Sequence, residues 1–127
     1  MLVNNYNIPI TKINLSDLEK EEVIKTLNSG WIVQGQKVAE FEKEFSKFVN
    51  VNYSVAVSSC TTALHLALLL LDVKEGDEVI VPSFTFVATA NVVEYVKAKP
   101  IFADIDIKTF NISIDSILSI IESKKYK

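Results

Sequence analysis

The sequence predicts an α/β fold in which parallel β-α-β units follow two N-terminal helices. Up to about residue 50, apolar side chains recur every three or four positions, which is the period of an amphipathic helix. From Ser54 onward, short β-prone runs alternate with helix-length segments, which is the pattern of a parallel sheet with crossover helices on its faces. With 127 residues and an apolar fraction of 49%, the chain can form one domain or part of a larger one.

The first helix is expected from about Asp17 to Asn28. Ser16 can cap its start, and Glu19 three residues later completes a capping box. Gly30 is a natural stop, because glycine readily takes the left-handed conformation that ends many helices. One face of this helix is apolar and consists of Leu18, Val23, Ile24 and Leu27.

The second helix is expected over residues 37–49, after a connector that begins at Trp31. Its apolar stripe consists of Val38, Phe41, Phe45 and Phe48. Because this spacing is helical, we expect the stripe to pack in a core.

The remaining elements alternate between strands and helices. Strands are expected at residues 55–57, 78–81 and 100–104, and helices at 63–71, 87–96 and 116–122. Pro82 closes the second strand, and Ser113 or Asp115 opens the last helix. The strands alternate with helices, so we expect them to be parallel.

Three polar loops follow the three expected strands, at residues 58–62, 83–86 and 104–106. In such sheets, ligands bind at the carboxyl ends of the strands. The loop at 58–62 leads into a helix, where free backbone N–H groups and the helix dipole favour an anion such as phosphate. Plain capping by Ser and Thr is the commoner role of such a loop.

The aromatic loop also has two interpretations. Phe84 and Phe86 could stack on a flat ring, or they could be core residues at the start of the next helix. Asp104 and Asp106 could bind a metal or act as a paired acid and base, but a cap or turn is the expected role.

Other signals narrow the class of protein. The net charge of −3 argues against a nucleic-acid surface, and all 13 basic residues are lysines. His65 is expected to pack and Cys60 to act as a spacer, because no catalytic or metal-ligand pattern includes them. Glycine-rich nucleotide loops are absent, which counts against an unrelated nucleotide-binding domain.

The expected location is the cytoplasm. Residues 1–6 lack the features of a secretory signal, and a single cysteine suits a reducing compartment. The apolar run at 63–71 is too short to span a bilayer, so no membrane partner is expected.

Four blocks, at residues 29–42, 55–68, 76–89 and 99–109, together resemble the DegT/DnrJ/EryC1/StrS family of pyridoxal-phosphate (PLP) aminotransferases. The resemblance implies part of a fold type I large domain and amino transfer from an amino acid to a keto-sugar on a nucleotide carrier. It also implies a role in nucleotide-sugar and polysaccharide biosynthesis, and homodimers when the protein is full length.

The same resemblance suggests site residues. The turn formed by Ser59, Cys60, Thr61 and Thr62 matches the phosphate cradle for PLP. Phe86 matches the aromatic residue that stacks on the pyridine ring, and Trp31 lies in the segment that approaches the substrate. Cys60 and Lys97 stand where the family commonly has glycine.

The family's catalytic lysine and the aspartate that pairs with the pyridine nitrogen have no counterpart in residues 1–127. We therefore expect the N-terminal part of a large domain, with the small domain absent, a sheet with an open edge, and no catalytic residue. The alternatives are a non-catalytic module for binding or dimerisation and a PLP-dependent sugar dehydratase relative.

Overall fold

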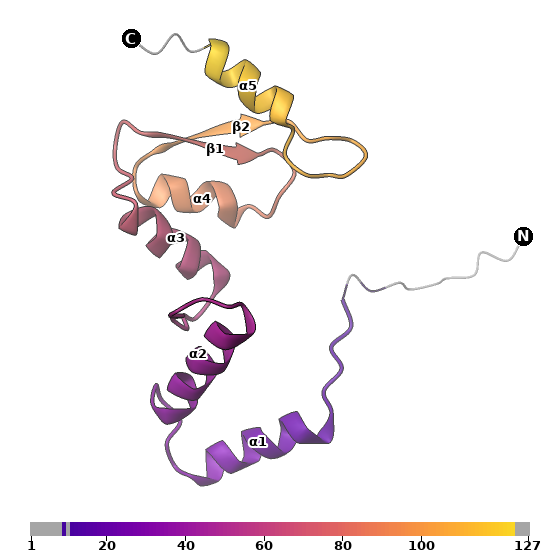
Figure 1. The fold of residues 1–127 in the computed structure, drawn as a ribbon, viewed down its shortest axis with the longest axis vertical. Coiled ribbons are helices and arrows are strands. Elements are labelled where there is room, and N and C mark those ends of the chain that lie inside the picture. The colour runs from indigo at the N-terminus through magenta and orange to yellow at the C-terminus, as the bar shows by residue number, and fades with distance from the viewer. Residues whose placement is uncertain (1–8, 10, 124–127) are drawn as a thin grey trace, which may run out of the picture. The chain divides into compact units, whose positions relative to one another are not determined.

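A computed structural model describes Pro9 and residues 11–123. The chain forms two compact units, Met1–Ala56 and Val57–Lys127; the helices and strands of both are labelled in Figure 1. Residues 1–8, residue 10 and residues 124–127 lie outside the described part; they include the N-terminal segment in which no secretory signal is expected.

The first unit contains α1 (Asp17–Asn28), with the bounds predicted from the sequence. The capping box is confirmed: the Glu19 carboxylate accepts a hydrogen bond from the Ser16 N–H at 2.6 Å. The Ser16 hydroxyl also donates to this carboxylate, and it lowers the pKa of Glu19. Gly30 follows the helix with a φ of +72°, so the predicted glycine stop is confirmed.

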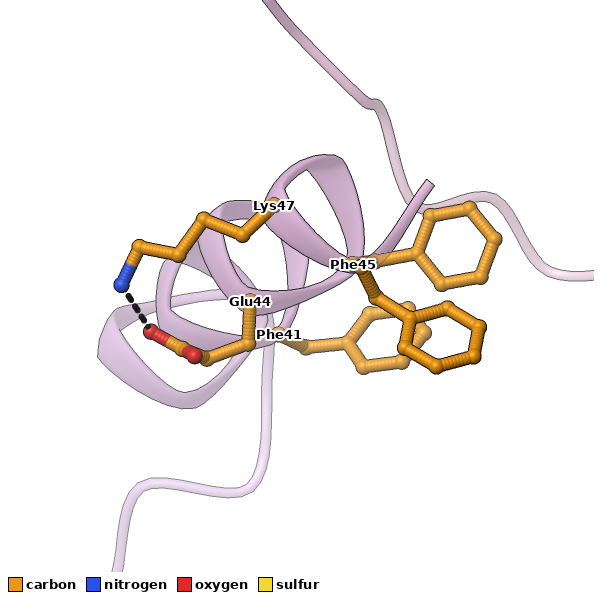
Figure 2. A pocket seen from close by; sticks show the side chains of 5 residues that line it. Phe41, Glu44, Phe45 and Lys47 are labelled. Atoms are coloured by element: carbon orange, nitrogen blue, oxygen red, sulfur yellow. Dashed lines mark hydrogen bonds and ion pairs between the residues drawn. The ribbon is translucent and has the colours of Figure 1, made fainter. Parts of the chain in front are cut away.

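The second helix of this unit, α2 (Gln36–Phe48), begins and ends one residue before the predicted bounds. The expected packing of its phenylalanine stripe is wrong, because Phe41, Phe45 and Phe48 are 58%, 46% and 87% exposed. Phe41, Phe45 and Phe48 line one hollow together with Glu44 and Lys47. Figure 2 shows Phe41 and Phe45 on this helix and the ion pair between Glu44 and Lys47, which is 2.7 Å long. No described segment of the unit covers the stripe, and Ser46 is its one buried residue among those described.

Glu22 links α1 to α2, and its titration gives a testable expectation. Its carboxylate accepts hydrogen bonds from Lys25 at 2.9 Å and from Lys37 at 3.0 Å. These bonds, with that from Lys25 the larger cause, lower the pKa of Glu22 from 4.5 to about 2. A pKa that is lower in the folded chain stabilises it above about pH 4.5, and this stabilisation is lost as the pH falls toward 2.

We therefore expect the Glu22 carboxyl carbon to titrate near pH 2 by NMR. In Lys37→Gln the midpoint should rise toward that of free glutamate, about 4.3. Lys12→Gln is the control and should leave the midpoint unchanged. A wild-type midpoint near that of free glutamate would contradict the linkage between the helices.

The second unit contains α3 (Cys60–Leu70), β1 (Glu78–Pro82), α4 (Ala88–Tyr95), β2 (Lys99–Ala103) and α5 (Ile114–Ser123). The predicted parallel pairing is confirmed, with Ile80 opposite Ile101. Figure 1 shows α4 and α5 on opposite sides of the two strands, while α3 contacts α4. The core between α4 and the sheet consists of Val81, Val93, Val96 and Ala98, with Leu68, Val73 and Val79 packed against it.

The predicted strand at residues 55–57 is wrong, because the structure places these residues in no strand. A strand needs a neighbour that satisfies its backbone N–H and C=O groups, and no described segment supplies one. The expected open edge is confirmed, since the described sheet has only the two strands β1 and β2.

Two helix starts also differ from the prediction, and serine caps explain both. The helix α3 begins three residues early, at Cys60, because Ser59 is its N-cap. The helix α5 begins two residues early, after Ser113, whose hydroxyl accepts from the Ser116 N–H at 3.2 Å. In the part of the chain that the structure describes, no helix combines the length and apolar character needed to cross a membrane.

Candidate cofactor site

The start of α3 forms the first part of the candidate site. Ser59 is extended, with φ −161° and ψ 161°, and its hydroxyl accepts a hydrogen bond from the Thr62 N–H at 3.1 Å. The Thr62 hydroxyl lies 3.0 Å from that of Ser59 and 3.2 Å from that of Ser58. Capping by Ser59, one of the two predicted roles of this turn, is therefore confirmed.

The cap leaves other donors available for an anion. The first helical N–H groups, those of Cys60 and Thr61, have no carbonyl four residues earlier within the helix. Cys60 is exposed and Thr61 is half-buried, so this end of the helix is accessible. Backbone N–H groups and hydroxyls at the positive end of a helix dipole are the donor set that a phosphate group requires. Capping and anion binding are therefore compatible here.

The loops after β1 and β2 meet at the carboxyl edge of the sheet. The Ser83 N–H donates to the Ala103 carbonyl at 2.8 Å, which ties the bases of the two loops together. Farther out, the rings of Phe84 and Phe110 have centroids 5.8 Å apart and are tilted by 45°. Two of the three predicted loops are thus brought together, whereas the side chains of Ser58, Ser59 and Thr62 form hydrogen bonds within their own turn.

The alternative that Phe84 and Phe86 are core residues is wrong for the described chain. Their side chains are 66% and 77% exposed, respectively. The Phe86 carbonyl accepts from the Thr89 N–H at 3.0 Å, directly before α4. The Phe86 ring is therefore accessible to a flat ligand, and its stacking role stays a prediction.

Asp106 organises a turn, as expected from the sequence. One of its carboxylate oxygens accepts from the backbone N–H groups of Lys108 and Thr109, both at 2.9 Å. These bonds, first that from Thr109, lower the pKa of Asp106. Asp104 accepts from the Ile105 N–H at 2.8 Å. Among the described residues, His, Cys, Asp and Glu side chains form no group of three or more that could hold a metal ion.

Trp31 belongs to the first unit, where its side chain is 62% exposed. Its indole N–H donates to the Gln34 carbonyl at 3.1 Å. This ring lies directly over Gly35, where an added Cβ would be 2.2 Å from the indole nitrogen. Glycine therefore lets the ring fold back over the connector, and the expected approach of Trp31 to a substrate stays a prediction.

Two further expectations are clarified by the structure. The half-buried His65 contacts Tyr95 edge to face at 5.6 Å between ring centroids, which confirms a packing role. Lys97 has a φ of +60°, the left-handed conformation that favours glycine, which the resemblance leads one to expect at this position. The sequence analysis did not predict a role for Phe110, whose ring contacts Phe84 in the loop after β1. The only local signal there was the predicted turn at the preceding residues.

A parallel β-α-β unit with free N–H groups at a helix start and an accessible aromatic ring beside a strand end has the features of a cofactor-binding α/β protein. The sequence profile described as the DegT/DnrJ/EryC1/StrS aminotransferase family matches residues 14–126. The chain belongs to this family, as the resemblance predicted.

Named relatives agree with this assignment. GDP-perosamine synthase of Escherichia coli O157:H7 is 43% identical over 118 residues, which cover 92% of this chain and 32% of that protein. The PLP form of the putative sugar aminotransferase Spr1654 from Streptococcus pneumoniae superposes with a TM-score of 0.82 at 39% identity, covering 90% of this chain and 29% of that one. The E. coli GDP-4-keto-6-deoxy-D-mannose-3-dehydratase with bound hydrated PLP superposes with a TM-score of 0.82 at 33% identity. The match covers 89% of this chain and 31% of that one.

The chain therefore spans about 30% of the length of these relatives. The expected partial α/β fold of a PLP-dependent transferase is confirmed by these structures. PLP, the expected cofactor, is named in both solved structures.

Proposed function

We propose that this chain supplies the phosphate cradle and the stacking ring of a PLP-dependent sugar aminotransferase. The observation that carries this proposal is the start of α3, where the N–H groups of Cys60 and Thr61 remain available beside the Ser59 cap. When bound, PLP supplies an electron sink for amino transfer. In this proposal Ser59, Cys60, Thr61 and Thr62 hold its phosphate, Phe86 lies against its ring, and Trp31 contacts the substrate.

The proposed substrates are a nucleotide-linked keto-sugar and an amino acid that donates the amino group. The relative GDP-perosamine synthase supports the sugar class through its name and its 43% identity. The proposal includes a homodimer for the full-length protein and a cytoplasmic location. It also treats residues 1–127 as an incomplete large domain that binds the cofactor without turning over.

A sugar dehydratase is the second candidate function. It is favoured by the E. coli dehydratase structure, whose TM-score of 0.82 equals that of the aminotransferase from Streptococcus pneumoniae. Both candidates use the same cradle. Amino transfer to the sugar distinguishes an aminotransferase from a dehydratase, so a complete protein that contains this chain should be assayed for both products.

The cradle and the lack of turnover can be tested on the 127-residue chain itself. We expect PLP to bind measurably in equilibrium dialysis. Pyridoxal, which lacks the phosphate, should bind at least about tenfold more weakly, because hydrogen bonds to a charged group contribute about 1.5–3 kcal/mol. With PLP, glutamate and a GDP-linked keto-sugar present, no amino sugar should form.

Borohydride treatment followed by mass spectrometry provides the control for covalent attachment. We expect no single lysine to be labelled stoichiometrically. Equal binding of PLP and pyridoxal would overturn the cradle. Amino-sugar formation, or full labelling of one lysine, would overturn the proposal that the chain lacks the catalytic lysine.

A further inference from the structure

We propose that Phe110 is a positioning residue that holds the loop carrying Phe86, a role that rests on the cofactor function proposed above. Phe110 lies in the loop after β2, and Phe86 lies in the loop after β1. The two strands are parallel neighbours, so both loops leave the same edge of the sheet. The ring of Phe110 contacts Phe84, two residues before Phe86.

The backbone of Phe110 is in an unfavourable conformation, with a φ of +59°. For a residue with a bulky side chain this left-handed region is sparsely populated, and it persists where the surrounding structure fixes it. Here the Phe110 N–H donates to the Asp106 carbonyl at 2.8 Å, and the Asp106 N–H donates to the Asn111 carbonyl at 2.9 Å. These bonds close the loop around Phe110 and hold its backbone in place.

The rest of this loop is anchored at both ends. The Asp106 carboxylate caps the N–H groups of Lys108 and Thr109, and Ile105 pairs with Ile112 in an antiparallel bridge. At its base, the Ser113 N–H donates to the Asp104 carbonyl at 2.8 Å. Hydrogen bonds within residues 104–113 therefore fix the loop that carries Phe110.

The contact of Phe110 with Phe84 is not explained by core burial, since the two side chains are 55% and 66% exposed. Backbone bonds hold the Phe86 loop only at its ends, through the Ser83 N–H at the sheet and the Phe86 carbonyl at the start of α4. Between these ends the structure gives two side-chain contacts: the Phe84 ring contacts Phe110, and the Thr85 hydroxyl lies 3.0 Å from that of Thr89 in α4. The Thr85 contact ties the loop to α4, whereas the ring pair ties it to the loop after β2 and so limits the direction from which Phe86 can meet a ligand ring.

Hydrogen exchange measured by mass spectrometry on the full chain tests this role. In Phe110→Ala, amides 83–88 should exchange about two- to tenfold faster, the range that corresponds to the energy of an aromatic pair. Phe110→Gly should give the same result, although glycine relieves the backbone strain, because it also lacks the ring. Phe110→Tyr retains the ring and should match the wild type. Ile107→Ala, at a 77% exposed position in the same loop, is the matched control and should have no effect.

The affinity for PLP provides the second readout. Phe110→Ala and Phe110→Gly should each lower the affinity for PLP by about two- to tenfold, the factor expected for the exchange rates. The affinity for inorganic phosphate, which contacts only the cradle, should equal that of the wild type. The double variant Phe84→Ala/Phe110→Ala should bind PLP with the same affinity as either single variant, because both substitutions remove the same ring contact.

Unchanged exchange of amides 83–88 in Phe110→Ala and Phe110→Gly would overturn the proposal. Faster exchange with unchanged PLP affinity would also overturn it, because the loop would then not position the cofactor ring. If the wild-type chain binds no PLP, the proposed function fails, and the exchange data still decide whether Phe110 holds the loop.

Discussion

Replacing Val93 with aspartate is expected to abolish the folded state of the second unit. Val93 is 1% exposed and packs with Val81, Val96 and Ala98 between α4 and the sheet. An unpaired carboxylate there would lose its hydration without gaining a partner, and the protonated form would still disrupt the packing. Such substitutions cost about 4 kcal/mol or more, a large share of the stability of a small domain.

The measurement is hydrogen exchange over residues 57–123, together with thermal unfolding followed by circular dichroism. Slowly exchanging amides of β1, β2 and α4 should disappear in Val93→Asp. Ile107→Asp is the control in the same unit, because Ile107 is 77% exposed and outside any helix or strand. Its effect should stay within about 0.5 kcal/mol. Retention of slow exchange in Val93→Asp would show that this cluster is not the core of the unit.

Replacing Cys60 with proline is expected to weaken PLP binding while leaving α3 intact. Cys60 is the first helical residue, where proline is tolerated because the N–H has no partner within the helix. Ser59 is already extended, with φ −161° and ψ 161°, as the residue before a proline prefers. The substitution therefore removes one backbone donor and little else.

The expected loss is about 1.5–3 kcal/mol, the contribution of a hydrogen bond to a charged group. This corresponds to an affinity for PLP that is about 10- to 150-fold lower. Cys60→Ala keeps the N–H and should bind PLP within about twofold of the wild type, and circular dichroism should show equal helix content in both variants. Wild-type affinity in Cys60→Pro would mean that this N–H group does not contact the phosphate.

The sequence predicted those elements whose signals are local. The bounds of α1 followed from the Ser16–Glu19 capping box and Gly30, and β1 followed from a β-prone run that begins at Glu78, although the strand includes Pro82, one residue past its predicted end. The parallel pairing followed from the helix-length connection between the strands. These features depend on the backbone preferences of a few neighbouring residues, and those preferences can be read from the sequence alone.

Other predictions depended on partners, and these were wrong. Residues 55–57 have strand propensity but no described neighbour with which to pair. The stripe of Phe41, Phe45 and Phe48 has helical spacing, but no described segment of its unit covers it. Strand pairing and burial each require a second segment that packs against the first. The sequence of one segment does not show whether that second segment is present.

For the candidate site, the sequence by itself determined the chemistry: the hydroxyls and the helix start at residues 58–62, the aromatic side chains of the loop after β1, and the family through the order of four blocks. The structure alone decided that Phe86 is exposed. The tertiary structure decided which groups meet. It showed that capping by Ser59 leaves the N–H groups of Cys60 and Thr61 available, and it placed Phe110 against Phe84. The reason is physical: a hydrogen-bond donor or a ring is fixed by residue type, whereas its partner is fixed by how parallel strands bring distant loops to one edge.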